Sequence, residues 1–309
     1  MKFGLQHPNF TFDGQGAMIV EKLKTLTQKA ESLGFDSFWV MDHFHQIGMV
    51  GEPHEPMLEG WTTQSVVAGF TNQIKLGVLV TGTVYRYPSV LAKVGATLDV
   101  LSKGRLFMGI GAAWNVDEAA AYGISFPPVK ERMQRLEETA QIIRRMWTEE
   151  RATFNGRFYQ VHEAYCNPKP IQKPHPPIMI GGSGERRTLK IVAKYADACN
   201  IFGSTETVKR KLNILKEHCR SVGRDYDSIL KSKLSHIVIE KERSKVAEAV
   251  KNLPEDSRQE YAIYGTPEDV QRQVNAFKDA GIEYLIVNLE PDRELQALEL
   301  FANNIVKKL

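Results

Sequence analysis

Short apolar runs alternate with helical patterns along most of the chain, and this alternation restricts the fold more than any other feature. It is typical of βα units, in which a helix follows each strand and returns the chain to a parallel sheet. Eight runs have the length and composition of strands: Lys2–Gln6, Ser37–Met41, Lys75–Thr81, Arg105–Gly111, Pro177–Gly181, Ala196–Phe202, Leu234–Ile239 and Tyr284–Leu289.

The helical patterns at the two ends of the chain agree with this reading. Apolar residues step by three and four from Ile19 to Leu33, and Gly34 can end that helix in the left-handed conformation. A second apolar stripe, from Leu295 to Leu309, follows the last strand. Eight strands with intervening helices predict an α/β fold, the TIM (β/α)8 barrel, as a single domain over residues 1–309; an open, doubly wound sheet is the alternative.

Two segments depart from the simple βα repeat. In residues 150–177, Asn155-Gly156 lies between Ala152–Phe154 and Arg157–Tyr159, which predicts a hairpin in an insertion after the fourth barrel unit. A proline-rich stretch then leads to the fifth strand. Residues 240–266 are charged and predict a helical surface segment without a strand, before a helix that starts near Thr266.

Composition excludes several classes of function. The chain has 40 Lys and Arg against 37 Asp and Glu in 309 residues, interleaved rather than clustered, so neither nucleic acid nor a membrane surface is an expected partner. The sequence has no apolar stretch long enough to span a membrane and no leader-like start, which predicts a cytoplasmic protein. Cys166, Cys199 and Cys219 have no spacing typical of disulfides or zinc sites.

The second predicted strand ends in titratable side chains. Active sites of parallel barrels lie at the carboxyl ends of the strands, so Asp42 and His43 are candidate site residues. A helix cap or an ordinary loop is the alternative for this pair. His43 and His45 have the spacing of a metal-binding pair, but the ends of the fifth and eighth strands offer no further histidine, and we predict no metal.

Two further strand ends carry unusual residues. Gly181, Gly182 and Ser183 precede a helix, which predicts a cradle for a phosphate or another anion; a plain tight turn is the alternative. Gly109-Ile110-Gly111 lacks the third glycine of a dinucleotide fingerprint, because Trp114 stands there. Trp114 is interpreted as a flat wall for a planar ligand or, alternatively, as a core residue.

Taken together, these residues resemble the bacterial luciferase-like family of oxidoreductases, which depend on flavin or on coenzyme F420. The resemblance covers essentially the whole chain and is carried by four segments in family order: Gly34–Phe44, Leu76–Pro88, Ser102–Leu106 and Ile180–Gly184.

The resemblance implies a cofactor with a flavin-like ring at the carboxyl ends of the barrel strands. Its ring would rest on a cis peptide bond between Leu79 and Val80, in a segment that includes Thr81, and its phosphate on Gly181, Gly182 and Ser183. Trp114 lies in a segment similar to a subgroup that uses F420. By the same resemblance Asp42 contacts the ring and His43 acts as the acid or base; sugar-phosphate dehydrogenases of the family have a glutamate in place of Trp114.

The expected activity is hydride transfer between coenzyme F420 and a small organic substrate. The alternative is an FMN-dependent monooxygenase that uses oxygen and reduced flavin, for which a flavin or F420 reductase would be a partner. A metal-dependent hydrolase and a barrel that binds a ligand without turnover are more distant alternatives. His7 and Phe10 are candidates for the substrate side, with His7 otherwise an idle loop residue. The resemblance also implies a homodimer, because members of this family commonly form one.

Overall fold

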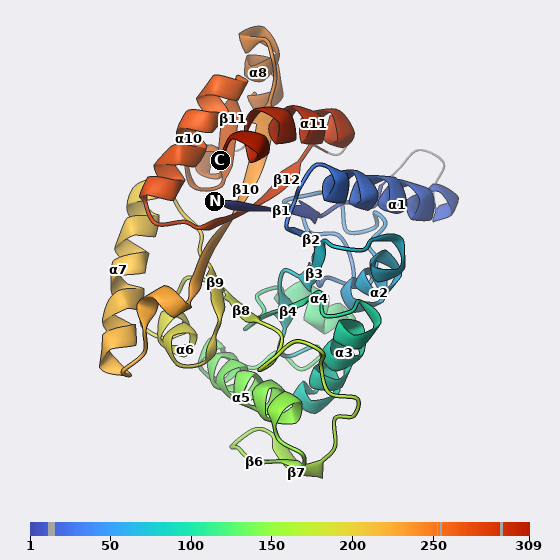
Figure 1. The fold of residues 1–309 in the computed structure, drawn as a ribbon, viewed down its shortest axis with the longest axis vertical. Helices are drawn as coiled ribbons and strands as arrows, with labels where there is room; N and C mark the ends of the chain where they lie inside the picture. The colour runs from blue at the N-terminus through green and yellow to red at the C-terminus, as the bar shows by residue number, and fades with distance from the viewer. Residues whose placement is uncertain (12–15, 252, 254, 291–292) are drawn as a thin grey trace.

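The computed structural model describes residues 1–11, 16–251, 253, 255–290 and 293–309. Eight parallel strands form a closed ring with helices on its outside (Figure 1). The ring closes because β10 pairs with both β9 and β12. In ring order the strands are β1 (Lys2–His7), β2 (Ser37–Val40), β3 (Lys75–Val78), β5 (Leu106–Gly111), β8 (Ile178–Gly181), β9 (Ala198–Asn200), β10 (Leu230–Ile239) and β12 (Tyr284–Leu289). The predicted TIM barrel is therefore confirmed.

A helix follows each strand of the ring. These helices are α1 (Gly16–Ser32), α2 (Gly60–Phe70), α3 (Pro88–Leu101), α5 (Val129–Thr148), α6 (Thr188–Tyr195), α7 (Thr205–Ser221), α10 (Pro267–Asp279) and α11 (Glu294–Asn304). Three further α-helices lie between them in the described part of the chain: α4 (Val116–Ala121), α8 (Arg243–Val250) and α9 (Glu255–Glu260). No helix in the described part of the chain combines the length and the apolar character needed to cross a membrane.

Local sequence signals explain several helix boundaries. α1 ends before Gly34, whose φ of +88° is the left-handed conformation expected there. α10 begins after Thr266, which forms a capping box with Asp269, and Pro267 occupies the first helical position. Both boundaries confirm the sequence prediction.

Alternate residues of each strand face opposite sides of the barrel wall. One set packs outward against the helices in the main core. The other set fills the barrel interior, where Trp39, Phe107, Met179, Tyr284 and Ile286 pack together. This alternation decides which residues at the strand ends can face the mouth of the barrel.

The described strands correspond to the eight predicted runs, with one division. The run Lys75–Thr81 is split into β3 and a short β4 (Thr81–Gly82), which pairs with β5. The split falls at the peptide bond between Leu79 and Val80, which is cis as the family resemblance implied.

The predicted hairpin is present, but its turn is longer than predicted. β6 (Ala152–Asn155) pairs antiparallel with β7 (Gln160–Ala164), so Arg157–Tyr159 belongs to the turn rather than to a strand. The carboxylate of Glu138 on α5 accounts for this difference, since it accepts hydrogen bonds from the backbone N–H groups of Arg157 (2.8 Å) and Tyr159 (3.0 Å).

The prediction of no strand within residues 240–266 was wrong. β11 (Ala262–Gly265) pairs with β10, whose ten residues extend beyond the ring. β11 is a strand because residues 236–239 of β10 are available to pair with it. The local sequence of residues 240–266 gives no sign of this partner. Helices α8 and α9 occupy the rest of the segment, as expected.

The barrel closes between elements from opposite ends of the chain. β12 lies between β1 and β10, with Tyr284 opposite Lys2 on one side and Ser232 on the other. β1 and β10 are therefore joined only through β12, the last strand of the ring along the chain.

Candidate active site

A cavity of about 350 Å³ opens at the carboxyl ends of the strands. Seven of the residues proposed from the sequence line it: Asp42, His43, Leu79, Val80, Trp114, Gly181 and Gly182. They come from the ends of β2, β3, β5 and β8, which are consecutive neighbours in the ring. Asn200, Phe202 and Leu234 complete the wall on the side of β9 and β10.

Glycines surround Val80 on one wall of this cavity. A Cβ atom on Gly111 or on Gly181 would lie 2.7 Å from the Val80 Cγ2, closer than real Cβ contacts allow. Glycine at both positions therefore leaves room for the Val80 side chain between β5 and β8. Val80 and these two glycines together line this side of the cavity.

His43 is held by a carboxylate that the sequence analysis did not identify. The His43 Nδ1 lies 2.8 Å from the Glu118 Oε2, and the hydroxyl of Tyr85 donates to the same oxygen at 2.6 Å. The other oxygen of Glu118 accepts from the backbone N–H of Phe44 at 2.6 Å. Since a carboxylate only accepts hydrogen bonds, the proton of neutral His43 is on Nδ1 and Nε2 carries the lone pair.

The donors around Glu118 keep it ionised. Burial alone would raise the pKa of this carboxyl, but the hydrogen bonds from His43, Tyr85 and the Phe44 backbone lower it to about 2. Burial and the hydrogen bond to this carboxylate also raise the pKa of the Tyr85 hydroxyl. Near neutral pH Glu118 is therefore a carboxylate that accepts hydrogen bonds from two side chains, His43 and Tyr85.

Asp42 forms a second buried pair beside the cavity. Arg86 donates from Nη1 and Nη2 to the two Asp42 oxygens, at 2.6 and 2.9 Å, and also contacts Glu59. Burial raises the pKa of the Asp42 carboxyl, and the Arg86 guanidinium opposes that shift. The two-point contact orients the Asp42 carboxylate at the cavity wall.

Trp114 is exposed rather than part of the core. The residue is 57% exposed, and its ring lies 5.5 Å from the His43 ring, centroid to centroid, in an edge-on arrangement. Because Trp114 also lines the cavity, the structure rules out the core interpretation and places an aromatic surface beside the candidate acid or base.

The predicted anion cradle has a cation next to it. The Lys211 Nζ on α7 donates to the Ser183 Oγ and to the carbonyl oxygen of Phe202, both at 2.9 Å. Gly182 has a φ of +109°, which is in the left-handed region. Its N–H already donates to the Asn200 carbonyl oxygen at 3.2 Å, so it does not point to a ligand. An anion at this turn would rely on Lys211 and Ser183 more than on the Gly182 amide.

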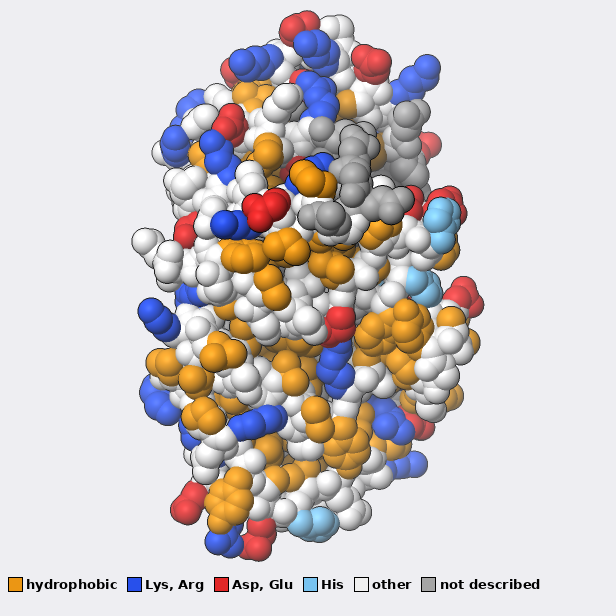
Figure 2. All heavy atoms as spheres, turned by 90° about the vertical axis from the view of Figure 1, so that its right-hand side faces the viewer, with side chains coloured by type: hydrophobic (Ala, Val, Ile, Leu, Met, Phe, Trp, Pro, Cys, Tyr) orange, Lys and Arg blue, Asp and Glu red, His pale blue; other side chains and the backbone are white. Residues whose placement is uncertain are grey.

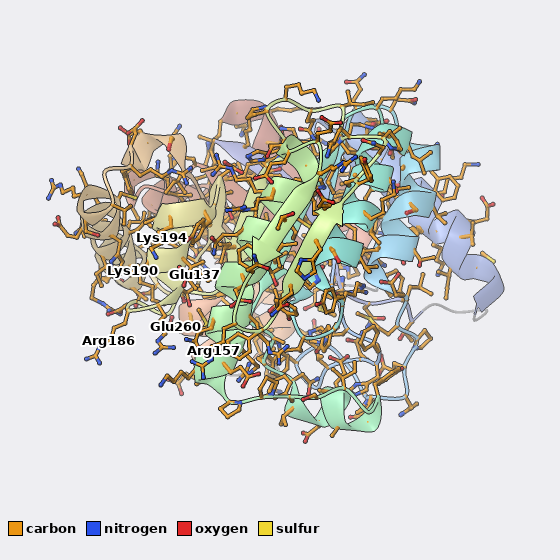
Figure 3. All side chains as sticks on the ribbon, turned by 90° about the horizontal axis from the view of Figure 1, so that it is seen from below. Glu137, Arg157, Arg186, Lys190, Lys194 and Glu260 are labelled. Atoms are coloured by element: carbon orange, nitrogen blue, oxygen red, sulfur yellow. The ribbon has the colours of Figure 1, made fainter. Side chains whose placement is uncertain are left out.

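The surface outside this turn carries further charges. Lys194 on α6 pairs with Glu137 on α5 at 2.8 Å. Figure 3 shows these two side chains, with Lys190, on the outer surface of the two helices. The Lys194–Glu137 pair therefore links α6, the helix that follows the Gly182 turn, to α5.

Four proposed residues do not line the cavity. Ser183 lies beside it, as described above, and the buried hydroxyl of Thr81 accepts from the Trp61 Nε1 at 2.9 Å. His7 and Phe10 are buried against each other, and the His7 Nδ1 lies 3.0 Å from Glu294 on α11. At the end of β1 the His7 side chain thus faces the helix layer, on the opposite side of the strand from Gln6.

Glu118, Tyr85, Arg86 and Lys211 were missed because they lie on helices or loops rather than at strand ends. Their partners are distant in sequence: 75 residues separate His43 from Glu118, and 44 separate Asp42 from Arg86. No local spacing marks such pairs. The acidic first turn of α4 was the one visible signal, and it is also an ordinary feature of helix N-termini.

The histidines after β2 are not arranged as metal ligands. His43 is oriented by Glu118, and the His45 Nδ1 contacts the carbonyl oxygen of Gln46 at 3.1 Å. Among the described residues, no three His, Cys, Asp or Glu side chains are grouped in a way that could hold a metal ion. This geometry lends no support to the hydrolase alternative.

Solved structures share the fold along nearly the whole chain. An F420-dependent secondary alcohol dehydrogenase, in complex with an F420-acetone adduct, superposes with a TM-score of 0.84 at 21% identity, covering 99% of this chain and 98% of the other. A monooxygenase from Streptomyces bottropensis has a TM-score of 0.82 at 22% identity, covering 100% and 99%.

Sequence relatives cover the chain as well. An F420-dependent glucose-6-phosphate dehydrogenase of Segniliparus rotundus is 27% identical over 323 residues, with 93% of each chain covered. An uncharacterized protein of Mycobacterium tuberculosis is 31% identical over 209 residues, covering 63% of this chain and 73% of the relative. The family described as luciferase-like monooxygenase matches residues 1–249. The chain therefore belongs to the luciferase-like monooxygenase family.

Proposed function

We propose that the protein is an oxidoreductase that transfers a hydride between coenzyme F420 and a small organic substrate. The observation that carries this proposal is the His43–Glu118 pair, whose histidine lines the same cavity as Leu79 and Val80. An F420-dependent relative that aligns with 93% of the chain supports the choice of cofactor.

The residues around the cavity fit a planar ring with an anionic tail. The apolar wall at Leu79 and Val80 would support one face of a flat ring, and Trp114 offers an aromatic edge at the opening. Lys211 and Ser183 provide a cation and a hydroxyl for a phosphate. Asp42, fixed by Arg86, would hold the polar edge of the ring.

When bound and reduced, F420 supplies a hydride from the carbon that stands where a flavin has N5. His43 would handle the accompanying proton. Glu118 fixes the Nδ1 proton, so the His43 Nε2 accepts a proton from a substrate hydroxyl during oxidation, and the imidazolium returns it during reduction. Glu118 remains a carboxylate in both directions and stabilises the charged ring.

Cofactor binding tests the proposal directly. Purified protein is titrated separately with F420 and with FMN while tryptophan fluorescence is followed, because Trp114 lies at the cavity. The variant Trp114→Phe is the control that assigns the signal. Micromolar binding of F420, with FMN at least tenfold weaker, supports the proposal. Tighter binding of FMN, or no binding of F420, contradicts it.

An FMN-dependent monooxygenase is the second candidate, because a monooxygenase and a riboflavin lyase solved with modified FMN share the fold at TM-scores of 0.82 and 0.84. The glycine-flanked wall and the cradle suit the ring and phosphate of FMN equally well. This alternative needs a reductase partner to deliver reduced flavin. Oxygen consumption with supplied reduced FMN and a candidate substrate would favour it, whereas oxygen-independent oxidation of reduced F420 would favour the first proposal.

The homodimer remains a proposal. Apolar side chains gather on the face that carries α1, α2 and α3 (Figure 2), and Val66, Val90 and Leu101 on α2 and α3 are 44 to 65% exposed. A surface of this kind suits a two-fold contact between copies. Sedimentation at several concentrations would test it, and a monomer at all of them would contradict it.

A further inference from the structure

Asn200, the last residue of β9, contributes a polar side chain to the cavity that the proposed function does not use. It lines the cavity beside the apolar side chains of Phe202 and Leu234. Ala198 belongs to the barrel interior, and Asn200, two residues further along the same strand, faces the same side. Asn200 is 1% exposed, and its Oδ1 has no hydrogen-bond partner among the described residues. The wall therefore contains a buried acceptor that none of these residues satisfies.

Ser232 on β10 determines which end of the Asn200 amide is left without a partner. The Ser232 hydroxyl donates its proton to the Cys199 carbonyl oxygen at 2.7 Å. The Ser232 oxygen is then the acceptor for the Asn200 Nδ2, which lies 3.0 Å away. The amide nitrogen is thus bound within the protein, and the carbonyl oxygen of the side chain is the atom that remains for a ligand.

A buried acceptor of this kind can distinguish between ligands. Leaving it without a donor costs free energy, so proteins rarely keep such an atom unless a ligand or a water molecule supplies the donor. A ligand with an O–H or N–H at this point gains a hydrogen bond, whereas one with a methyl group or an ether oxygen there leaves the Asn200 Oδ1 unpaired. Asn200 can therefore select between compounds that differ in a single donor hydrogen.

The wall that carries Asn200 lies across the barrel from the wall that would support the ring (Figure 1). In the eight-strand ring, four steps separate β2 from β9, and four separate β3 from β10. His43 and Val80, which follow β2 and β3, line the same cavity as Asn200. A ring that rests on Val80 would turn its free face toward β9 and β10, so a substrate would lie between the ring and Asn200.

We propose that Asn200 is a specificity-determining residue whose Oδ1 accepts a hydrogen bond from a second donor group of the substrate, on the side away from His43. This donor is a hydroxyl or an N–H, in addition to the group that exchanges the hydride. The inference rests on the proposed function, because it needs a cofactor ring at the Val80 wall, and it adds the substrate class to that function. His43 handles the proton of the reacting group, while Asn200 holds the far end of the molecule.

Pairs of compounds that differ in one donor hydrogen test this inference. One pair is trans-1,4-cyclohexanediol and its monomethyl ether, and the other is trans-4-acetamidocyclohexanol and the acetate ester with oxygen in place of the N–H. Binding is measured by calorimetry on protein saturated with whichever of F420 and FMN it binds more tightly, so the choice of cofactor is decided separately. We expect the donor compound of at least one pair to bind about fivefold or more tightly than its counterpart. A smaller ratio in both pairs, or no binding of either donor compound, overturns the inference.

Variants assign the preference to Asn200. Asn200→Leu, which is similar in size and lacks the amide, should bring the ratio within twofold of unity and leave the dissociation constant of the cofactor within threefold. Asn200→Ala is the second variant in case the first does not fold. Asn303→Leu, the same change on the exposed side of α11, is the matched control and should keep the native ratio. An unchanged ratio in the folded Asn200 variants overturns the inference, and a weaker binding of the cofactor alone would assign Asn200 to the cofactor instead.

Discussion

Replacing Glu118 with glutamine should weaken both the fold and the activity. The carboxylate accepts hydrogen bonds from His43, from Tyr85 and from the Phe44 backbone, at 2.8, 2.6 and 2.6 Å. The amide of Glu118→Gln has one acceptor oxygen and an NH2 group, so some of these donors would face another donor. His43 would also lose the partner that fixes its tautomer.

The loss of stability in this variant can be estimated in two ways. The pKa of Glu118 is lowered from 4.5 to about 2, a shift that corresponds to roughly 3 kcal/mol of stability above both values. Loss of one or two hydrogen bonds to a charged group gives a similar figure, at about 1.5 to 3 kcal/mol each. Because the folded-state pKa is depressed, this stability is present above the unfolded-state pKa and is lost as the pH falls from about 4.5 to about 2.

Urea denaturation at a series of pH values measures the effect. We expect Glu118→Gln to be about 3 kcal/mol less stable than the native protein at pH 7, with a difference that shrinks as the pH falls through the window above. Asp117→Asn, on the next residue of α4 and exposed, is the control and should change stability by less than about 1 kcal/mol. A difference below about 1 kcal/mol for Glu118→Gln, or one that does not change with pH, would refute the reasoning.

Three further predictions address the rest of the site. His43→Ala should lower kcat at least 100-fold, or about 2.7 kcal/mol, while F420 binding stays within threefold; equal losses in both would make His43 a structural contact. Gly182→Asp should weaken F420 binding more than tenfold, or about 1.4 kcal/mol, relative to Gly182→Ala, which shares the strain at φ +109° without the charge; equal affinities would argue against a phosphate at this turn. Arg86→Met should cost about 3 to 5 kcal/mol in denaturant unfolding because it leaves Asp42 buried without its cation, and a loss below about 1 kcal/mol would contradict the buried pair.

The barrel could be predicted from the sequence because its signals are local and repeated. Each strand run is short and apolar, and each helix has its own periodicity, so a wrong boundary does not change the fold. β11 was missed for the opposite reason: its four residues form a strand because β10 extends beyond the ring, which is a property of the tertiary structure. The turn of the hairpin was set by Glu138, a residue outside the hairpin.

The candidate site could be predicted only in part. Residues at or near the carboxyl ends of strands, such as Gly181 and His43, were found because the fold places strand ends together. The carboxylate that orients His43 was not found, because α4 brings it back from a distant part of the chain. Near the end of β1 the sequence drew attention to His7, although the alternation of the strand turns Gln6 toward the mouth and His7 toward α11.

The position of β12 between β1 and β10 has a consequence for how the chain folds as it is synthesised. Until residues 284–289 are available, β1 and β10 each present an unpaired edge, and the half-built sheet is open to pairing with other chains. β1 is synthesised well before β12, and its edge toward β12 stays unpaired during that interval.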